Sequence, residues 1–326
     1  MRYILGVDIG GTNLVVGAVA EDGSALIGLR SESTGAAHGP DAVIERIVGM
    51  AKRTIADTVQ AVPNAEITGV GVGCPGPLNI ATGIVVLTPN LGWVNMPVRD
   101  RIESALERPT AIDNDANCAM AGEWWIGAAK GARHALTVTL GTGIGGGIVI
   151  DGKLFHGASD VAGEVGHMTI ETNGRRCGCG NDGCLEAYAS GPAIAQRTIE
   201  ALEAGADSSI RTLVGDDLTT ITAQIVYDAA AANDPLALEV VRDTAKYLGT
   251  GVANLINLLN PEVVVICGGV TLAGDRLFKP LRREVNRRAF RPAVDACRIV
   301  PGLLPGTAGV YGAAKAFLEQ EGSRRA

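Results

Sequence analysis

The chain has 326 residues, of which 47% are hydrophobic and 19% are charged, and its net charge is −7. This length suits one large domain or two ordinary ones, and the acidic balance excludes a broad basic surface for nucleic acid or anionic lipid. No apolar run reaches the roughly 18 residues of a transmembrane helix, and no signal peptide is expected at the N-terminus. Seven cysteines without a secretory context predict reduced thiols in a cytoplasmic protein.

Apolar runs typical of strands alternate with helical spacings, which indicates an α/β fold. Residues 3–9 and 14–20 flank Gly-Gly-Thr and predict a hairpin, and residues 40–62 carry apolar side chains at a spacing of four, which predicts a helix. The further expected strands are 67–73, 84–88, 109–112, 135–140, 148–150, 262–266 and 297–300, and the further expected helices are 97–107, 116–129, 192–205, 219–232, 235–259, 275–289 and 307–320.

The strand–glycine–strand pattern of residues 3–23 returns at 135–152, where a second hairpin also ends in Asp-Gly. This repeat predicts an internal duplication. We therefore expect two α/β lobes, the first at about 1–115 and the second at about 116–304, with the last helix on either lobe.

The two glycine turns suggest phosphate binding. Residues 141–146 match G-x-G-x-x-G, but they lead into a strand, whereas a dinucleotide-binding turn leads into a helix. Backbone N–H groups of such turns can still hold phosphate, Thr12 and Thr142 add hydroxyl donors, and Asp8 could hold Mg²⁺. The pair 268–269 follows a buried strand and could pack against a nucleotide. Tight hairpins without any ligand are an equally open alternative.

Three polar residues, Asp113, Asn114 and Asp115, stand between an expected strand and an expected helix. Asp and Asn are favoured helix caps, so capping is the structural alternative for these residues. Three in a row exceed what capping needs, and a carboxylate at the head of a helix could accept a proton from a substrate hydroxyl. Phosphoryl transfer from a nucleotide to an alcohol uses such a base.

Residues 167–184 contain one histidine and three of the seven cysteines in the pattern H-x9-C-x-C-x4-C. Three thiolates and one imidazole suit tetrahedral Zn²⁺, and four protein ligands predict a closed structural site. A redox pair, chance clustering and a nucleic-acid-binding zinc ribbon are the alternatives, and only two arginines flank the cysteines. Glu164 and Glu186 stand on either side of the expected ligands, where a fixed carboxylate could receive two vicinal sugar hydroxyls.

These motifs resemble the ROK family (repressor, open reading frame, sugar kinase), and within it the bacterial glucokinases. The resemblance runs from Asp8 to the last helix, and its most specific part is CGCGNDGCLEAYAS with GEVGH before it. It implies a two-lobed actin-like (ribonuclease H-like) ATPase fold with a cleft, in which 305–326 returns to the first lobe and a zinc insertion spans 164–186.

The resemblance also implies a role for each matched position, in a reaction of Mg·ATP with glucose. Asp115 would be the general base on the 6-hydroxyl, and His167 would both bind zinc and touch the sugar. The implied sugar ligands are Gly76, Asn90, Asn114, Asp115, Glu164, His167 and Glu186. The implied nucleotide and magnesium positions are Asp8, Gly10, Gly11, Thr12, Asn13, Gly141, Thr142, Gly143, Gly268 and Gly269. The implied zinc ligands are His167, Cys177, Cys179 and Cys184.

The resemblance leaves other functions open. Fructose, mannose, N-acetylglucosamine or N-acetylmannosamine could replace glucose, and polyphosphate could replace ATP. The family also contains sugar-responsive repressors, which carry a helix-turn-helix segment before the first lobe. The first expected strand begins near residue 3, so we expect no such segment and no nucleic acid or membrane partner. A homodimer or homotetramer is the expected assembly.

Overall fold

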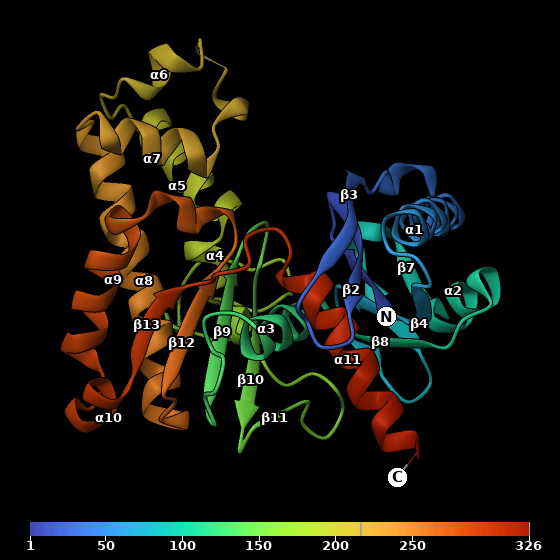
Figure 1. Ribbon diagram of the computed structural model, residues 1–326. Helices are drawn as coiled ribbons and strands as arrows, with labels where there is room; N and C mark the ends of the chain where they lie inside the picture. The colour runs from blue at the N-terminus through green and yellow to red at the C-terminus, as the bar shows by residue number, and fades with distance from the viewer. Residues whose placement is uncertain (216, 326) are drawn as a thin grey trace. The chain divides into compact units, whose positions relative to one another are not determined.

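The first sheet is built on the N-terminal hairpin that the sequence predicts (Figure 1). The computed structural model describes residues 1–215 and 217–325, and in it β1 (Arg2–Ile9) and β2 (Asn13–Ala20) pair antiparallel. Strands β4 and β8 continue the sheet parallel to β1, so their carboxyl ends meet at one edge. The strand order is β3-β2-β1-β4-β8, and the remaining bounds are β3 (Leu26–Ser33), β4 (Glu66–Cys74) and β8 (Thr110–Asn114).

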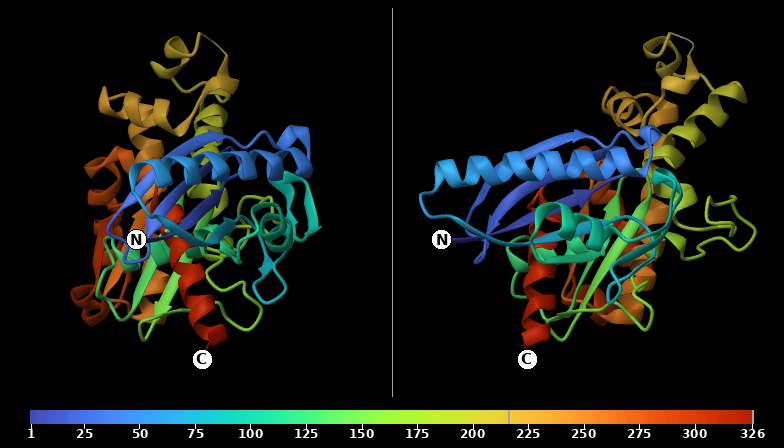
Figure 2. Two further views of the ribbon diagram at one scale, coloured as in Figure 1. Left: turned by 45° about the vertical axis from the view of Figure 1, so that its right-hand side comes forward. Right: turned by 90° about the vertical axis from the view of Figure 1, so that its right-hand side faces the viewer.

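Helices cover both faces of this sheet (Figure 2). Strand β1 shows why, because its side chains alternate between two buried clusters. Leu5 packs with Ile47 of α1, whereas Ile4 packs with Val310 and Phe317 of α11. The helices of this part of the chain are α1 (Pro40–Ala61), α2 (Val98–Leu106), α3 (Asp115–Trp125) and α11 (Ala308–Arg325).

A second five-stranded sheet repeats the plan of the first. Its order is β11-β10-β9-β12-β13, and β9, β12 and β13 lie parallel, as β1, β4 and β8 do. The matching orders agree with the duplication predicted from the two glycine hairpins. The bounds are β9 (Ala135–Leu140), β10 (Ile144–Ile150), β11 (Lys153–Leu154), β12 (Val263–Cys267) and β13 (Arg298–Pro301).

The other elements are a small antiparallel sheet and a set of helices between β11 and β13. The small sheet consists of β5 (Leu78–Asn79), β6 (Ile84–Thr88) and β7 (Trp93–Met96). The helices are α4 (Glu186–Ala189), α5 (Gly191–Glu203), α6 (Ile210–Leu213), α7 (Ala223–Ala231), α8 (Pro235–Leu259), α9 (Asp275–Arg288) and α10 (Arg291–Ala296). Short 3-10 helices are η1 (Ala36–His38), η2 (Pro89–Leu91), η3 (Val165–His167), η4 (Leu218–Thr220) and η5 (Gly269–Ala273).

Several elements differ from the sequence prediction for local reasons. Strand β3 was not predicted, because this edge strand is only partly buried and lacks a continuous apolar run. The helix predicted over 219–232 starts later, at Ala223, because Thr222 caps it by accepting a hydrogen bond from the Ile225 N–H. The helix predicted to reach residue 129 ends at Trp125. Helices α6 and α10 are short and were not predicted.

The chain divides into two compact units. The first comprises Met1–Arg133, Gly147–Gly163 and Gly302–Ala326, and the second comprises His134–Gly146 and Glu164–Pro301. Within the described part of the chain, no helix has both the length and the apolar character that crossing a membrane requires.

The first unit includes α3, although the sequence prediction draws its lobe boundary at residue 115. The reason is the packing of α3 on α11. At the end of α3, the buried Glu123 carboxylate accepts hydrogen bonds from the backbone N–H groups of Ala128, Leu303 and Leu304 at 2.8–3.1 Å. This carboxylate ties α3 to the segment that leads into α11. The predicted lobes, 1–115 with 305–326 and 116–304, stay a prediction.

Glycines let α11 approach its neighbours without intervening side chains. A Cβ at Gly312 of α11 would lie 1.6 Å from the carbonyl oxygen of Cys118 in α3. A Cβ at Gly71 of β4 would lie 1.8 Å from the Ala313 carbonyl oxygen of α11. Glycine in a helix interior costs about 1 kcal/mol relative to alanine, so close packing is the reason to have one at position 312.

Two alanine substitutions in α11 should therefore have opposite effects. Gly312→Ala forces α3 and α11 apart, and we expect it to destabilise the fold by about 1–3 kcal/mol and to lower the Tm. Gly322→Ala is the matched control, because a Cβ there meets nothing within 4 Å and alanine favours the helix. Differential scanning fluorimetry of both variants measures the difference. An unchanged or raised Tm for Gly312→Ala would contradict the packing argument.

Candidate active site

The turn between β8 and α3 carries the predicted general base. Asn114 ends β8 and caps α3, since its Oδ1 accepts the N–H groups of Ala116 at 2.9 Å and Asn117 at 3.2 Å. The capping alternative is therefore right for Asn114. Asp115 follows as the first helical residue and is only partly buried, and the helix N-terminus favours its negative charge. The Asn114 amide group also donates to the Gly76 carbonyl at 3.4 Å.

Asp8 lies near the end of β1 and belongs to the same carboxylate group. Burial, and after it the charge of Asp115, raise the pKa of Asp8 to about 7. Gly309 of α11 packs so closely that a Cβ there would lie 2.2 Å from an Asp8 carboxylate oxygen. Two carboxylates that disfavour each other's charge in this way form an environment in which a divalent cation is stabilised.

Two buried thiols lie near the carboxylates of Asp8 and Asp115. Cys74 ends β4, Cys118 lies in α3, and both are completely buried. Burial is the main cause that raises the pKa of each thiol, and the carboxylates of Asp8, Asp113 and Asp115 add to it. Both cysteines are therefore uncharged packing residues, and they surround the carboxylates with a medium of low polarity.

The first glycine turn leaves backbone exposed next to Asp8. The Gly10 N–H donates to the Asn13 carbonyl at 2.9 Å, which closes the turn, and Gly11, Thr12 and Asn13 are all exposed. Asn90 lies next to Gly11, because a Cβ added at Gly11 would be 3.6 Å from the Cβ of Asn90. The predicted phosphate turn and one predicted sugar ligand are thus neighbours within the first unit.

The second glycine turn is fixed by Glu186. The Ile144 N–H donates to Glu186 Oε2 at 2.8 Å, and a Cβ at Gly143 would lie 2.6 Å from the same oxygen. The Gly141 carbonyl accepts from the Gly191 N–H at 2.9 Å, at the start of α5. Gly141 and Thr142 remain exposed. The turn predicted to hold phosphate therefore contacts a carboxylate predicted to hold the sugar, within the second unit.

The four predicted zinc ligands converge on one point. One ring nitrogen of His167 and the Sγ atoms of Cys177, Cys179 and Cys184 all lie within 4.8 Å of one another. The Sγ atoms of Cys179 and Cys184 are 3.7 Å apart, and Cys177 Sγ is 3.8 Å from His167 Nδ1. Zn–S bonds of about 2.3 Å in a tetrahedron place ligand atoms about 3.8 Å apart. The donor atoms therefore fit a tetrahedral zinc ion.

The imidazole of His167 has a different neighbour on each side. Its Nδ1 faces the cysteine cluster, and its Nε2 lies 3.8 Å from the Glu164 carboxylate. The side chains of His167 and Glu164 are 35% and 46% exposed, so Nε2 and the carboxylate can reach a ligand from solvent. Cys177 Sγ is also 4.0 Å from Glu186 Oε1. Glu164, His167 and Glu186 thus form one group anchored by the cysteine cluster.

The second unit also contains a cavity of about 670 Å³, which is the size of a small-molecule site. Gly141, Thr142 and Gly269 line it, and these are three of the positions predicted to contact the nucleotide. Gly268 has another role, because it adopts φ 94° and a Cβ there would lie 2.2 Å from the Leu140 carbonyl oxygen.

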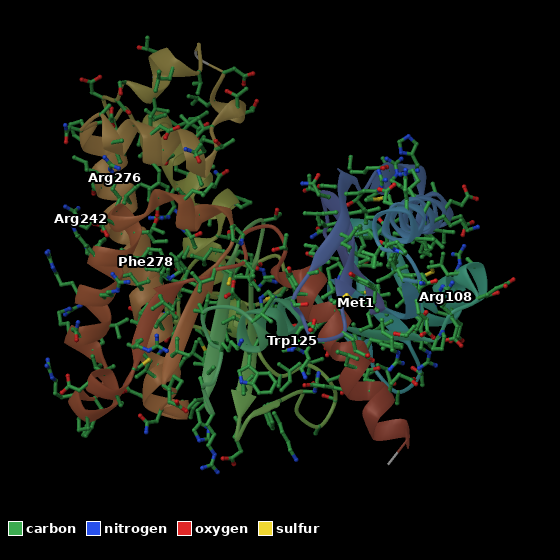
Figure 3. All side chains as sticks on the ribbon, in the orientation of Figure 1. Met1, Arg108, Trp125, Arg242, Arg276 and Phe278 are labelled. Atoms are coloured by element: carbon green, nitrogen blue, oxygen red, sulfur yellow. The ribbon has the colours of Figure 1, made fainter. Side chains whose placement is uncertain are left out.

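The sequence does not predict that most of the polar residues of this cavity line a common site. Gln196 comes from α5, Gln224 and Asp228 from α7, and Arg276 from α9. Figure 3 labels Arg276 beside the start of α9. The four-residue spacing of Gln224 and Asp228 indicates a shared helix face, but it does not reveal what that face borders. Only the packing of the helices shows that these side chains share a cavity.

Comparisons with known proteins match the chain over nearly its whole length. A model of the ROK family matches residues 4–320. The glucokinase of Halalkalibacterium halodurans is 38% identical over 330 residues, covering 99% of this chain and 97% of the relative. The glucokinase of Thermotoga maritima is 37% identical over 321 residues, covering 98% of each chain. A solved ROK family glucokinase from Streptomyces griseus, in complex with glucose and AMPPNP, gives a TM-score of 0.83 at 31% identity, covering 96% of this chain and 98% of its own.

The matched residues include both glycine turns, the β8–α3 turn, the cysteine cluster and the cavity of the second unit. The family resemblance predicted from these motifs is confirmed. On this evidence the chain belongs to the ROK family.

Proposed function

We propose that the chain is a glucokinase, which transfers the γ-phosphoryl group of Mg·ATP to the 6-hydroxyl of glucose. The observation that carries the proposal is the likeness, over 96% of the chain, to a glucokinase solved with glucose and AMPPNP. The two curated glucokinases of similar length support the same reaction. The site residues below are part of this proposal.

Asp115 is the proposed general base. Phosphoryl transfer has a loose transition state, so orientation of the attacking hydroxyl matters more than the strength of the base. Asp115 sits on the first turn of a capped helix, which fixes its direction. Asn114, Gly76 and Asn90 are the proposed sugar contacts from the same unit, and the hydrogen bond from Asn114 to Gly76 supports a shared role.

Glu164, His167 and Glu186 are the proposed sugar contacts from the second unit. Vicinal hydroxyls suit carboxylates whose positions are already fixed, because little ordering entropy is then lost on binding. The Ile144 N–H bond holds Glu186, and the ring of His167 is oriented by its neighbours on both sides. In this proposal His167 Nε2 receives a glucose hydroxyl while Nδ1 binds zinc.

The cavity lined by Gly141, Thr142 and Gly269 is the proposed site for the nucleoside of ATP. Turns 10–13 and 141–143, in which residues 11–13, 141 and 142 are exposed, are the proposed phosphate contacts through their backbone. Asp8 would hold Mg²⁺ directly or through water, and the bound ion would neutralise charge on the phosphates. The raised pKa of Asp8 fits a carboxylate whose charge is stabilised by a cation.

Zinc bound by His167, Cys177, Cys179 and Cys184 is the proposed structural ion. Four protein ligands leave no open position, so the ion supplies rigidity and no reaction chemistry. We also propose the two-lobed actin-like arrangement and the homodimer or homotetramer that the family resemblance implies. Light scattering would determine the assembly.

A coupled assay tests the substrate proposal directly. The purified protein would be given Mg·ATP with glucose, fructose, mannose, N-acetylglucosamine or N-acetylmannosamine, and then glucose with polyphosphate in place of ATP. The proposal expects the highest kcat/KM for glucose with ATP. A higher value for another sugar or for polyphosphate would reassign the substrate, and no turnover with any of them would reject the kinase function.

Asp115→Asn should abolish turnover while leaving glucose affinity within about tenfold. The amide keeps the size of the side chain but cannot accept the hydroxyl proton. The coupled assay measures kcat, and isothermal titration measures glucose binding. Asp41→Asn is the matched control, because that carboxylate lies in the same unit and is 81% exposed. Substantial activity in Asp115→Asn would remove this residue from the mechanism.

Ala273→Phe should obstruct the cavity of the second unit and raise the KM for ATP at least about tenfold. Ala273 lines the cavity, and a benzyl group there occupies space that a nucleoside would need. Glucose binding without nucleotide should stay within about twofold. Ala204→Phe, at the exposed end of α5, serves as the control. If Ala273→Phe leaves the KM for ATP unchanged, the nucleoside binds elsewhere.

The protein should contain one zinc ion per chain, measured by inductively coupled plasma mass spectrometry. Cys179→Ala removes one donor of the cluster, and we expect it to lose the ion, lower the Tm and weaken glucose binding. Cys297→Ala is the control, because that thiol is only partly buried and lies outside the cluster. Absence of zinc from the wild-type protein, or full activity of Cys179→Ala, would refute the coupling between zinc and the sugar site.

A further inference from the structure

The residue before the Asn114-Asp115 pair has a buried charge with an unusual set of partners. The side chain of Asp113 is only 2% exposed. Its Oδ1 accepts the N–H of Asn114 at 2.7 Å and the side-chain amide of Asn117 at 3.2 Å. Its Oδ2 is 2.8 Å from Nε2 of His156. A buried carboxylate is costly unless donors satisfy it, so these three bonds hold Asp113 in place.

These bonds connect Asp113 to residues on both sides of the proposed base, Asp115, in the sequence. Asn114 precedes Asp115 and Asn117 follows it by two residues, and both are bonded to the same Asp113 oxygen. The Asn114 cap accepts the N–H of Asn117 as well, which closes a small ring of hydrogen bonds around the helix start. A shift of the Asp113 carboxylate would therefore move the turn from which Asp115 projects.

His156 comes from a loop that is itself anchored. The carbonyl of His156 accepts the Ala162 N–H at 3.1 Å, and the Asp160 carboxylate further along accepts the Ile80 N–H at 3.0 Å. The loop and the β8–α3 turn belong to the first unit. These hydrogen bonds hold the loop backbone that carries His156, so the imidazole can hold Asp113 in a defined position.

The surroundings of His156 favour its charged form. Burial opposes protonation, but the hydrogen bond with Asp113 and the carboxylates of Asp113, Asp160 and Glu319 outweigh it and raise the pKa of the imidazole. An imidazolium beside a buried carboxylate makes a stronger hydrogen bond than two neutral groups would. The pair is therefore suited to a positioning role.

We infer that His156 is a positioning residue for phosphoryl transfer, which acts by holding the Asp113 carboxylate and, through it, the Asn114-Asp115 turn. The inference rests on the proposed kinase function, since it assumes that the orientation of Asp115 determines the rate of phosphoryl transfer. His156 makes no contact with substrate in this scheme. Its loss should lower kcat and leave ATP binding unchanged, because the proposed nucleoside cavity belongs to the second unit.

The geometry suggests a matched set of variants. The amide nitrogen of glutamine reaches about as far along the side chain as Nε2, whereas that of asparagine reaches only as far as Nδ1. Because Nε2 is the atom that faces Asp113, His156→Gln can restore the bond and His156→Asn cannot. His156→Ala removes the ring completely, and His38→Ala is the control, because His38 is an exposed histidine of the same unit.

The test measures kcat, the KM for ATP and hydrogen–deuterium exchange of a peptide covering residues 110–120 in the zinc-loaded full chain. We expect His156→Asn and His156→Ala to lower kcat at least about tenfold, with the KM for ATP within about twofold and faster exchange in the peptide. We expect His156→Gln and His38→Ala to stay within about threefold of the wild-type kcat, with unchanged exchange. Millimolar imidazole should partly restore kcat to His156→Ala.

Two results would overturn the inference: unchanged exchange and kcat in His156→Ala, or equal losses in His156→Gln and His156→Asn. The wild-type assay separates this outcome from failure of the proposed function. If the wild-type protein does not phosphorylate any sugar, the kinase proposal fails. The exchange data then still decide whether His156 holds the β8–α3 turn.

Discussion

The start of α3 must hold three consecutive polar side chains in three different environments, and the proposed chemistry depends on this arrangement. Asp113 points into the protein, Asn114 caps the helix, and Asp115 begins the helix with its carboxylate partly exposed. The alternation follows from the backbone, because β8 ends and α3 begins within these residues. The Asn114 cap satisfies helix N–H groups that would otherwise lack partners. The cap therefore stabilises the helix and fixes the direction of its first side chain.

In the second unit, a single carboxylate, that of Glu186, fixes the backbone next to the proposed sugar contacts in a comparable way. Glu186 accepts the Ile144 N–H through one oxygen and lies 4.0 Å from the Cys177 sulfur through the other. The glycine turn and the cysteine cluster are therefore joined through one carboxylate. Arg175, two residues before Cys177, pairs with Glu200 of α5, and α5 lines the cavity. The proposed metal ligands are thus connected to those sugar and nucleotide contacts that belong to the second unit, so a change in the cysteine cluster can affect both.

How much the sequence could predict depends on the distance between partners along the chain. The β1–β2 hairpin and the cysteine cluster were predictable, because their defining residues are neighbours and few other structures place such residue types at that spacing. The bond between His156 and Asp113 joins residues 43 positions apart, and the bond between Ile144 and Glu186 joins residues 42 positions apart. No periodicity in the sequence predicts such pairs, since they form only when the sheets and loops pack together. The polar residues of the cavity were missed for the same reason.

The structure also distinguishes the two aspartates of the Asp113-Asn114-Asp115 run, which residue type and spacing leave equivalent as bases and which only the family resemblance separates. Both oxygens of Asp113 already accept hydrogen bonds, from Asn114, Asn117 and His156, and the side chain is almost completely buried. A carboxylate with both oxygens engaged and no access to solvent cannot receive a proton from an incoming hydroxyl. Asp115 is partly exposed at the head of a helix, where a substrate can approach it. We therefore assign the proposed role of base to Asp115, and to Asp113 the role of keeping the turn in place.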